Sequence, residues 1–181
     1  ELRPVVGALA VGAVGIASFD LLGAGLAGID KALAGQFATS TLLLLVLGKI
    51  LATSFTLGSG GSGGVFSPSL FTGALLGALF GDVITELFPG SSAPAGAYAV
   101  VGMAAVFAAA AQAPMSSIFI VFEMTSDFGL IMPLMLACAA ATVVYTAVNP
   151  NSIYMEKIRR RHVTIDAPPD PSDLASIPLS H

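Results

Sequence analysis

The sequence predicts an all-α, polytopic membrane protein built from short, broken and tilted helices. Its 181 residues are 55% hydrophobic and only 10% charged, and its mean hydropathy is +0.89, whereas soluble domains usually carry about 25% charged residues. Between Lys49 and Glu156 the only charged side chains are Asp82, Glu86, Glu123 and Asp127. A segment of this length has too few charged side chains to form a water-exposed surface. The same scarcity of charge disfavours the alternative fold, a buried helical core of a large soluble protein.

Apolar runs separated by glycine- and proline-rich breaks define the first expected helices. They are Pro4–Ser18, a short segment around residues 28–34 that follows a glycine-rich break, and Thr41–Leu57, which carries Lys49. A fourth helix, Val65–Phe80, starts after a glycine-rich stretch and is followed by the loop PGSSAPAG at residues 89–96. Glycine, proline and serine clusters of this kind mark loops between helices.

Three further apolar segments are Tyr98–Ala111, Pro114–Met124 and Leu130–Val148, and a last helix starts behind Asn149 and Pro150. A helix rises about 1.5 Å per residue and the hydrocarbon core is about 30 Å thick, so the segments 98–111 and 114–124 are too short to span it. Only 130–148 has close to the roughly 20 residues that a simple span requires. Helices that stop partway are tolerated where they line a cavity, as in transporters and channels.

Small residues and terminal charges add to this picture. Gly73, Gly77 and Gly81 form a stripe that lets helices approach closely in lipid. A basic run follows the last helix and predicts a cytoplasmic C-terminus, although it also suits a solvated helix end; it comprises Lys157, Arg159, Arg160 and Arg161. The chain lacks an initiator Met and a basic leader, so we expect no signal peptide and a piece of a longer protein.

Other features of the composition are less informative. The net charge of −4 gives no support to nucleic-acid binding. The single cysteine, Cys138, lies in an apolar run and is expected to be a buried core residue.

The stretch GSGGSGGVFSPSLF at residues 58–71 admits two functional interpretations. Gly58, Gly60 and Gly63 match the G-x-G-x-x-G dinucleotide fingerprint, and Asp82 lies near the distance at which an acid is expected. The preceding segment, however, is leucine-rich and too long for a strand. This context disfavours a dinucleotide-binding oxidoreductase module, which is kept as the alternative function. A flexible loop that binds no ligand is a third interpretation of the stretch.

In the membrane interpretation, the glycines expose the backbone and Pro68 opens a helix. The amides of Val65 and Phe66 then lie at a helix N-terminus in a low-dielectric environment. Unpaired N–H groups and the positive end of the helix dipole favour an anion there. A permeating anion also needs no buried cation, which could hold it too tightly to release it.

Three segments resemble the CLC family of chloride channels and chloride/proton exchangers. They are KILATSFTLGSGGSGGVFSPSLFTGALLGALFG at 49–81, GMAAVFAAAAQAPMSSIFIVFEMTSDF at 102–128 and NSIYMEKIRRR at 151–161. The resemblance covers residues 2–161 and implies one half of an inverted-repeat pore domain, namely its C-terminal half at residues 1–162, followed by a cytoplasmic tail at 163–181. The N-terminal half of that domain is not in this chain.

The resemblance also implies roles for individual residues. Val65 and Phe66, within the backbone motif that also contains Gly64, Ser67 and Pro68, are expected to donate their amides to a chloride ion. The hydroxyl of Tyr154 is expected to bind the same ion. No catalytic residue, metal or cofactor is implied, and the protein is not expected to be an enzyme.

Partner and mechanism follow from the resemblance only in part. It implies a homodimer in the lipid membrane through helices 114–124 and 130–148. The transport mechanism, channel or exchanger, is left open because the gating and proton glutamates of the family belong to the other half. The transported anion, chloride or nitrate, is left open as well. Half a pore could also be inactive by itself. We expect Glu123 to be a satisfied acid at a helix junction, and Lys49 to snorkel or to pair with a carbonyl or an acid.

Overall fold

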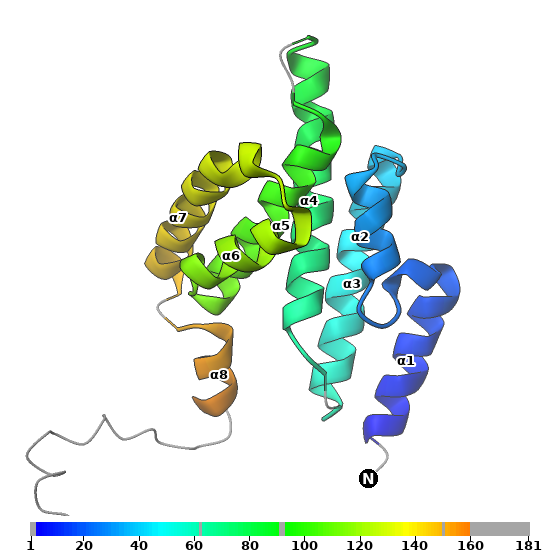
Figure 1. Ribbon diagram of the computed structural model, residues 1–181. Helices are drawn as coiled ribbons and strands as arrows, with labels where there is room; N and C mark the ends of the chain where they lie inside the picture. Colours follow the sequence, from blue (N-terminus) through cyan, green and yellow to red (C-terminus); the bar gives the residue numbers. More distant parts are fainter. Residues whose placement is uncertain (1–2, 62, 91–92, 150, 160–181) are drawn as a thin grey trace, which may run out of the picture.

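The computed structural model describes residues 3–61, 63–90, 93–149 and 151–159, and within these ranges the chain forms helices and loops without a strand. Figure 1 shows their arrangement. The α-helices are α1 Arg3–Ala17, α2 Leu26–Leu33, α3 Thr39–Gly58, α4 Phe66–Leu87, α5 Ala95–Ala111, α6 Pro114–Thr125, α7 Ile131–Val148 and α8 Ile153–Arg159. Two 3-10 turns, η1 Phe19–Leu21 and η2 Phe128–Leu130, precede α2 and α7. The all-α prediction is confirmed.

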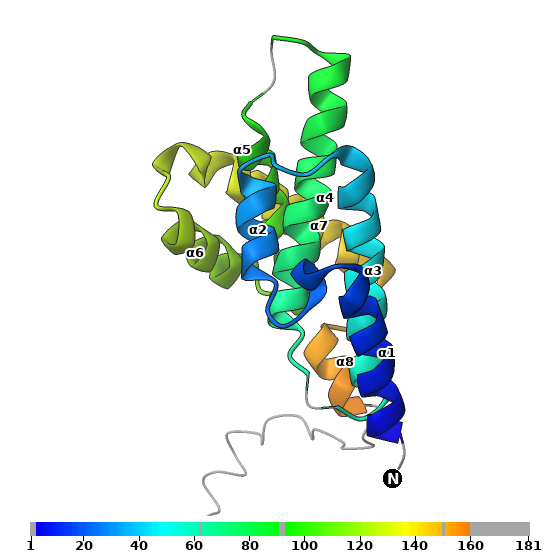
Figure 2. The same ribbon diagram turned by 90° about the vertical axis from the view of Figure 1, so that its right-hand side faces the viewer.

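Helix α4 is the centre of the assembly. It packs against α5 most extensively and also against α3 and α2, while α5 carries α6 and α7 on its other side. Figures 1 and 2 show α1 to α3 on one flank of α4, α6 and α7 on the other, and α8 at the same end as the start of α4. The buried core follows this arrangement, since Phe71 and Leu75 of α4 and Met103 and Phe107 of α5 belong to one apolar cluster.

Glycines bring α4 and α5 together. A Cβ atom at Gly73 would lie 2.6 Å from the carbonyl oxygen of Gly102, and one at Gly77 would overlap the carbonyl of Tyr98. A Cβ at Gly81 would lie 2.8 Å from the Tyr98 ring. The predicted stripe of small residues is therefore confirmed as the surface on which the two backbones approach.

The expected helix ends lie close to those observed, with one exception. Helix α4 continues beyond Phe80 to Leu87 and has 22 residues, so the prediction that only 130–148 is long enough to span a membrane was wrong. Three helical segments are long and apolar enough: Thr39–Gly58, Phe66–Leu87 and Phe128–Val148. Within the added turns, the Asp82 carboxylate accepts a hydrogen bond of 2.7 Å from the hydroxyl of Thr39 at the start of α3.

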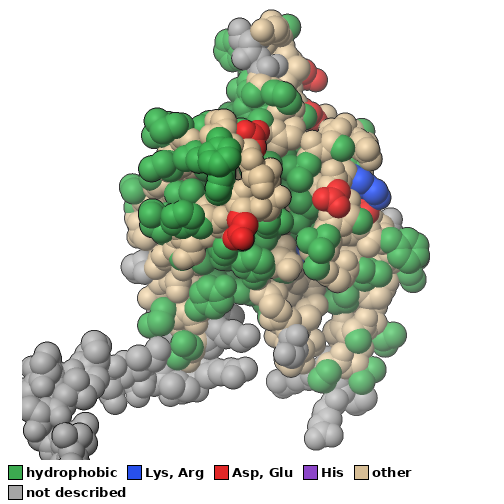
Figure 3. Space-filling model, viewed as in Figure 1, with side chains coloured by type: hydrophobic (Ala, Val, Ile, Leu, Met, Phe, Trp, Pro, Cys, Tyr) green, Lys and Arg blue, Asp and Glu red, His purple; other side chains and the backbone are tan. Residues whose placement is uncertain are grey.

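The outer surface of the molecule is apolar. Figure 3 shows few charged side chains and many hydrophobic ones on the face that it presents. Large exposed residues include Leu44 of α3 at 69% exposure and Leu136 of α7 at 71%. Helices α5 and α6 are apolar but shorter than a span, as predicted. This surface suits lipid and protein partners better than water.

Candidate functional site

The glycine-rich stretch forms the turn between two long helices. Helix α3 ends at Gly58, and the amide of Gly61 donates to the carbonyl of Thr56 at 3.0 Å. Gly60 has φ +84°, a left-handed conformation that favours glycine. Since a helix of 20 residues precedes the stretch, the strand–turn–helix context that the dinucleotide interpretation requires is missing.

Val65 is the N-cap of α4. Its carbonyl accepts the first helical hydrogen bond, from the amide of Ser69 at 3.2 Å, and also the Ser69 hydroxyl at 2.7 Å. The first four amides of a helix lack partners within it. Here these positions are Val65, Phe66, Ser67 and Pro68, and proline has no N–H. Three backbone donors therefore lie at the positive end of a 22-residue helix.

One cavity of about 310 Å³ lies beside this N-terminus. Val65 and Pro68 line it from α4, Thr53 from α3 and Ile153 from α8, although 88 residues of sequence separate Val65 from Ile153. The cavity therefore brings the motif at 64–68 together with the helix that carries Tyr154. Its remaining lining residues are Ile50, Ser54, Leu57, Ser69, Thr72 and Val106.

The predicted site residues do not all face this cavity. The Phe66 ring makes an edge-on contact with the ring of Phe107, with 4.8 Å between ring centroids. Tyr154, in the first turn of α8, is 45% exposed and does not line the cavity. Its expected role as an anion ligand stays a prediction, as do the roles of Val65 and Phe66.

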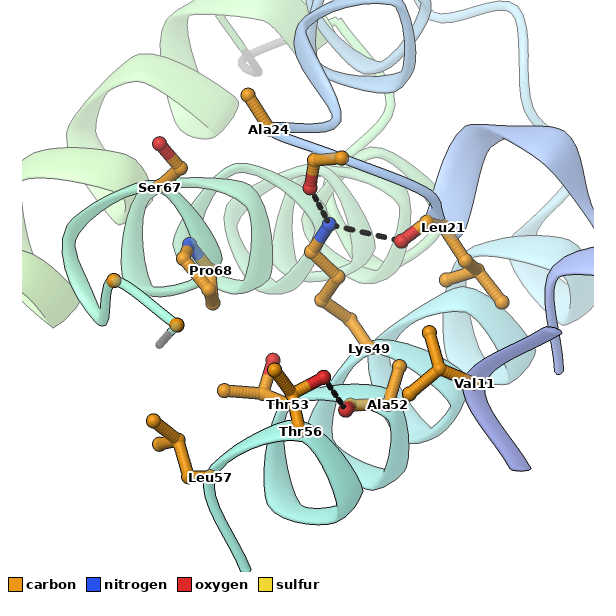
Figure 4. Close-up of a pocket in the computed structure, with 13 residues that line it drawn as sticks. Val11, Leu21, Ala24, Lys49, Ala52, Thr53, Thr56, Leu57, Ser67 and Pro68 are labelled. Atoms are coloured by element: carbon orange, nitrogen blue, oxygen red, sulfur yellow. Dashed lines mark hydrogen bonds between the residues drawn. The ribbon is translucent and has the colours of Figure 1, made fainter. Parts of the chain in front are cut away.

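A second cavity, of about 400 Å³, is also lined by residues of the motif. Gly64, Ser67 and Pro68 line it together with Lys49 and Thr53 of α3. Figure 4 shows Ser67, Pro68 and Thr53 around the cavity, with the Lys49 side chain reaching toward Leu21 at the end of η1. The motif thus contributes to both cavities, which share Thr53, Leu57 and Pro68 as lining residues.

Lys49 is buried, with 2% exposure. Its ammonium group donates to the carbonyls of Leu21 and Gly23, each at 3.0 Å, and lies 4.7 Å from the centroid of the Phe71 ring. Carbonyls rather than an acid thus satisfy this cation, one of the alternatives expected for it. Glu123, in contrast, is exposed near the end of α6, and its expected place at a helix junction agrees with this position.

Sequence reasoning missed Thr53 and Ile153 as lining residues. Thr53 lies one turn after Lys49 on α3, so the spacing of polar residues on one helix face was an available signal. Ile153 had no such signal, because its place in the cavity depends on how α8 packs. Among the described residues, no group of three or more His, Cys, Asp or Glu side chains could hold a metal ion.

These features define a helical membrane protein in which the start of a long helix, flanked by two cavities, meets a short C-terminal helix. The model of the voltage gated chloride channel family matches residues 1–146, and the chain belongs to this family. The resemblance to CLC proteins is confirmed.

Individual relatives agree with this assignment. The chain is 40% identical over 169 residues to a putative chloride channel protein ClcB-like of Ralstonia nicotianae, covering 93% of this chain and 39% of that protein. It is 37% identical over 141 residues to the H(+)/Cl(-) exchange transporter ClcA of Vibrio parahaemolyticus, covering 78% and 30%. A solved slow cyanobacterial Cl-/H+ antiporter superposes with a TM-score of 0.70 at 31% identity, covering 77% and 33%. The chain thus spans about a third of the length of these relatives.

Proposed function

We propose that the complete protein carries chloride across the membrane, as a channel or as a chloride/proton exchanger. In this proposal the amides of Val65 and Phe66 and the hydroxyl of Tyr154 hold the ion, with Gly64, Ser67 and Pro68 forming the supporting backbone. The observation that carries it is the cavity that Val65 and Ile153 line together, since it brings the start of α4 beside the helix that bears Tyr154.

The electrostatics of this site favour reversible anion binding. The amides and the dipole of α4 attract negative charge. Lys49, the buried cation nearest along the chain, already donates to the carbonyls of Leu21 and Gly23. A chloride ion at the amides would therefore be bound by dipoles rather than by direct pairing with a full charge, so it can also leave. Such transport involves no enzymatic reaction and no cofactor.

The same proposal assigns the parts of the chain. Residues 1–162 form the C-terminal half of the pore domain, and the N-terminal half completes the anion path. The tail at 163–181, which lies outside the described residues, is cytoplasmic. Two copies associate through residues 114–124 and 130–148. Exposed apolar side chains on these helices, such as Phe119 and Leu136, support this association.

Reconstitution tests the proposal. The full-length protein in liposomes is expected to release chloride when a potassium ionophore balances the charge, and Tyr154→Phe is expected to weaken chloride binding. Tyr98→Phe is the matched control, because the Tyr98 hydroxyl lies in the α4–α5 loop region and accepts from the amide of Ala93 at 3.3 Å. A full-length protein that moves no halide would refute the proposal. Proton flux driven by a chloride gradient separates an exchanger from a channel.

A further inference from the structure

Helix α8 is short and depends on its surroundings for its position. It has seven residues, Ile153–Arg159, which is too short for a helix to be stable by itself. The hydroxyl of Ser152 accepts from the amide of Met155 at 3.3 Å and so caps its start. The placement of Tyr154 is therefore determined by whatever holds the connection between α7 and α8.

A corner between two other helices reaches this connection. The C-cap of α5 is Gln112, which has φ 54° and ψ 39°, and α6 begins two residues later at Pro114. This left-handed conformation is uncommon for a residue other than glycine and is retained only where the surroundings require it. Glycine would meet the backbone requirement at lower cost, so the glutamine points to a role for its side chain.

The side chain of Gln112 has such a role. Its Nε2 donates to the backbone carbonyl of Asn149 at 3.3 Å, across 37 residues of sequence. Asn149 is the C-cap of α7, and its side-chain oxygen accepts from the amide of Asn151 at 3.1 Å. A chain of hydrogen bonds therefore runs from the α5–α6 corner through Asn149 to the residues immediately before α8.

We propose that Gln112 is a positioning residue for the anion site. By holding the carbonyl of Asn149, it fixes where α8 begins and hence where Tyr154 lies relative to the start of α4. Ile153, next to Tyr154, already lies in the cavity that Val65 lines, so a small displacement of α8 changes the distance between hydroxyl and amides. This inference rests on the proposed function.

A double-mutant cycle in the full-length protein tests the inference by chloride titration calorimetry. Gln112→Ala and Gln112→Gly both remove the side-chain donor. Glycine adopts the left-handed backbone conformation without strain, so the Gln112→Gly variant stays informative if Gln112→Ala damages the fold. Both variants are expected to weaken chloride binding about threefold to tenfold, the range for one hydrogen bond. Gln36→Ala, an exposed glutamine before α3, is the control and is expected to bind as the wild type does.

The cycle with Tyr154→Phe identifies the route of the effect. If Gln112 acts through the tyrosine hydroxyl, Gln112→Gly changes chloride affinity less than about twofold in the Tyr154→Phe background, because coupled residues are not additive. Two results overturn the inference alone: a Gln112→Gly protein that binds as the wild type does, or a loss that is the same in both backgrounds. A wild-type protein that binds no chloride overturns the proposed function and this inference with it.

Discussion

The ammonium group of Lys49 lies 4.7 Å from the centroid of the Phe71 ring and joins α3 to α4. The same group donates to two carbonyls of the loop that precedes α2. A Cβ at Gly25, which has φ +76°, would lie 3.2 Å from the Lys49 nitrogen and 2.5 Å from the Phe71 ring. One buried cation thus holds together two long helices and a loop, next to the cavity that Gly64 and Ser67 line.

Lys49→Met is expected to destabilise the full-length protein. Methionine keeps most of the side-chain volume but leaves the carbonyls of Leu21 and Gly23 without this donor, and each unsatisfied buried group costs about 1–3 kcal/mol. Thermal unfolding in detergent measures the effect as a lower Tm. Lys31→Met is the control: its partner is Asp20 at 2.8 Å, but its side chain is 44% exposed, and exposed ion pairs contribute about 0–1 kcal/mol. An unchanged or raised Tm for Lys49→Met would contradict the expected role.

Gly77→Ala is expected to force α4 and α5 apart. The new methyl group would overlap the carbonyl of Tyr98, and both helix backbones would have to shift. Overpacking of this kind costs about 1–3 kcal/mol, so the Tm of the full-length protein should fall. Gly12→Ala is the matched control, since a Cβ at Gly12, also in a helix, meets nothing within 4 Å, and alanine favours a helix by about 1 kcal/mol. Equal effects at the two positions would show that close approach does not determine stability here.

Local patterns explain why most helices and the glycine turn could be predicted from the sequence. Apolar runs and glycine- or proline-rich breaks are local signals, and they located α5, α6 and the start of α4. The end of α4 was missed: the helix continues past Asp82, whose carboxylate accepts from the Thr39 hydroxyl 43 residues away, a tertiary contact that no local pattern shows.

In the candidate site, too, local features could be predicted from the sequence and tertiary contacts could not. The start of α4 at Val65 could be predicted, because the glycines and Pro68 are adjacent to it in sequence. The contact of Gln112 with Asn149 could not, because it depends on how two helix corners meet across 37 residues. The resemblance to a family, rather than a local pattern, indicated Tyr154.

If the protein forms the proposed dimer through α7, a bulky residue on the exposed face of this helix should separate the two copies. Leu136→Trp is expected to yield a monomer, because Leu136 is 71% exposed and indole is too large for a closely packed interface. Light scattering of the full-length protein in detergent gives the mass. Leu44→Trp on α3, 69% exposed, is the control and should leave the mass unchanged. A Leu136→Trp dimer with wild-type affinity would place the interface elsewhere.

Val65→Pro and Val65→Ala together test the backbone donor at the start of α4. Both replace the valine side chain that lines the cavity, but only proline removes the N–H. Proline is accepted at the start of a helix, but Val65 has φ −101° and proline needs about −65°, so the Tm of both variants is measured to show that the fold is kept. A hydrogen bond to a charged group contributes about 1.5–3 kcal/mol, and about 1.4 kcal/mol corresponds to a tenfold change in Kd. Chloride titration should therefore give an affinity at least about tenfold weaker for Val65→Pro than for Val65→Ala. Equal affinities would mean that the Val65 amide does not bind the ion.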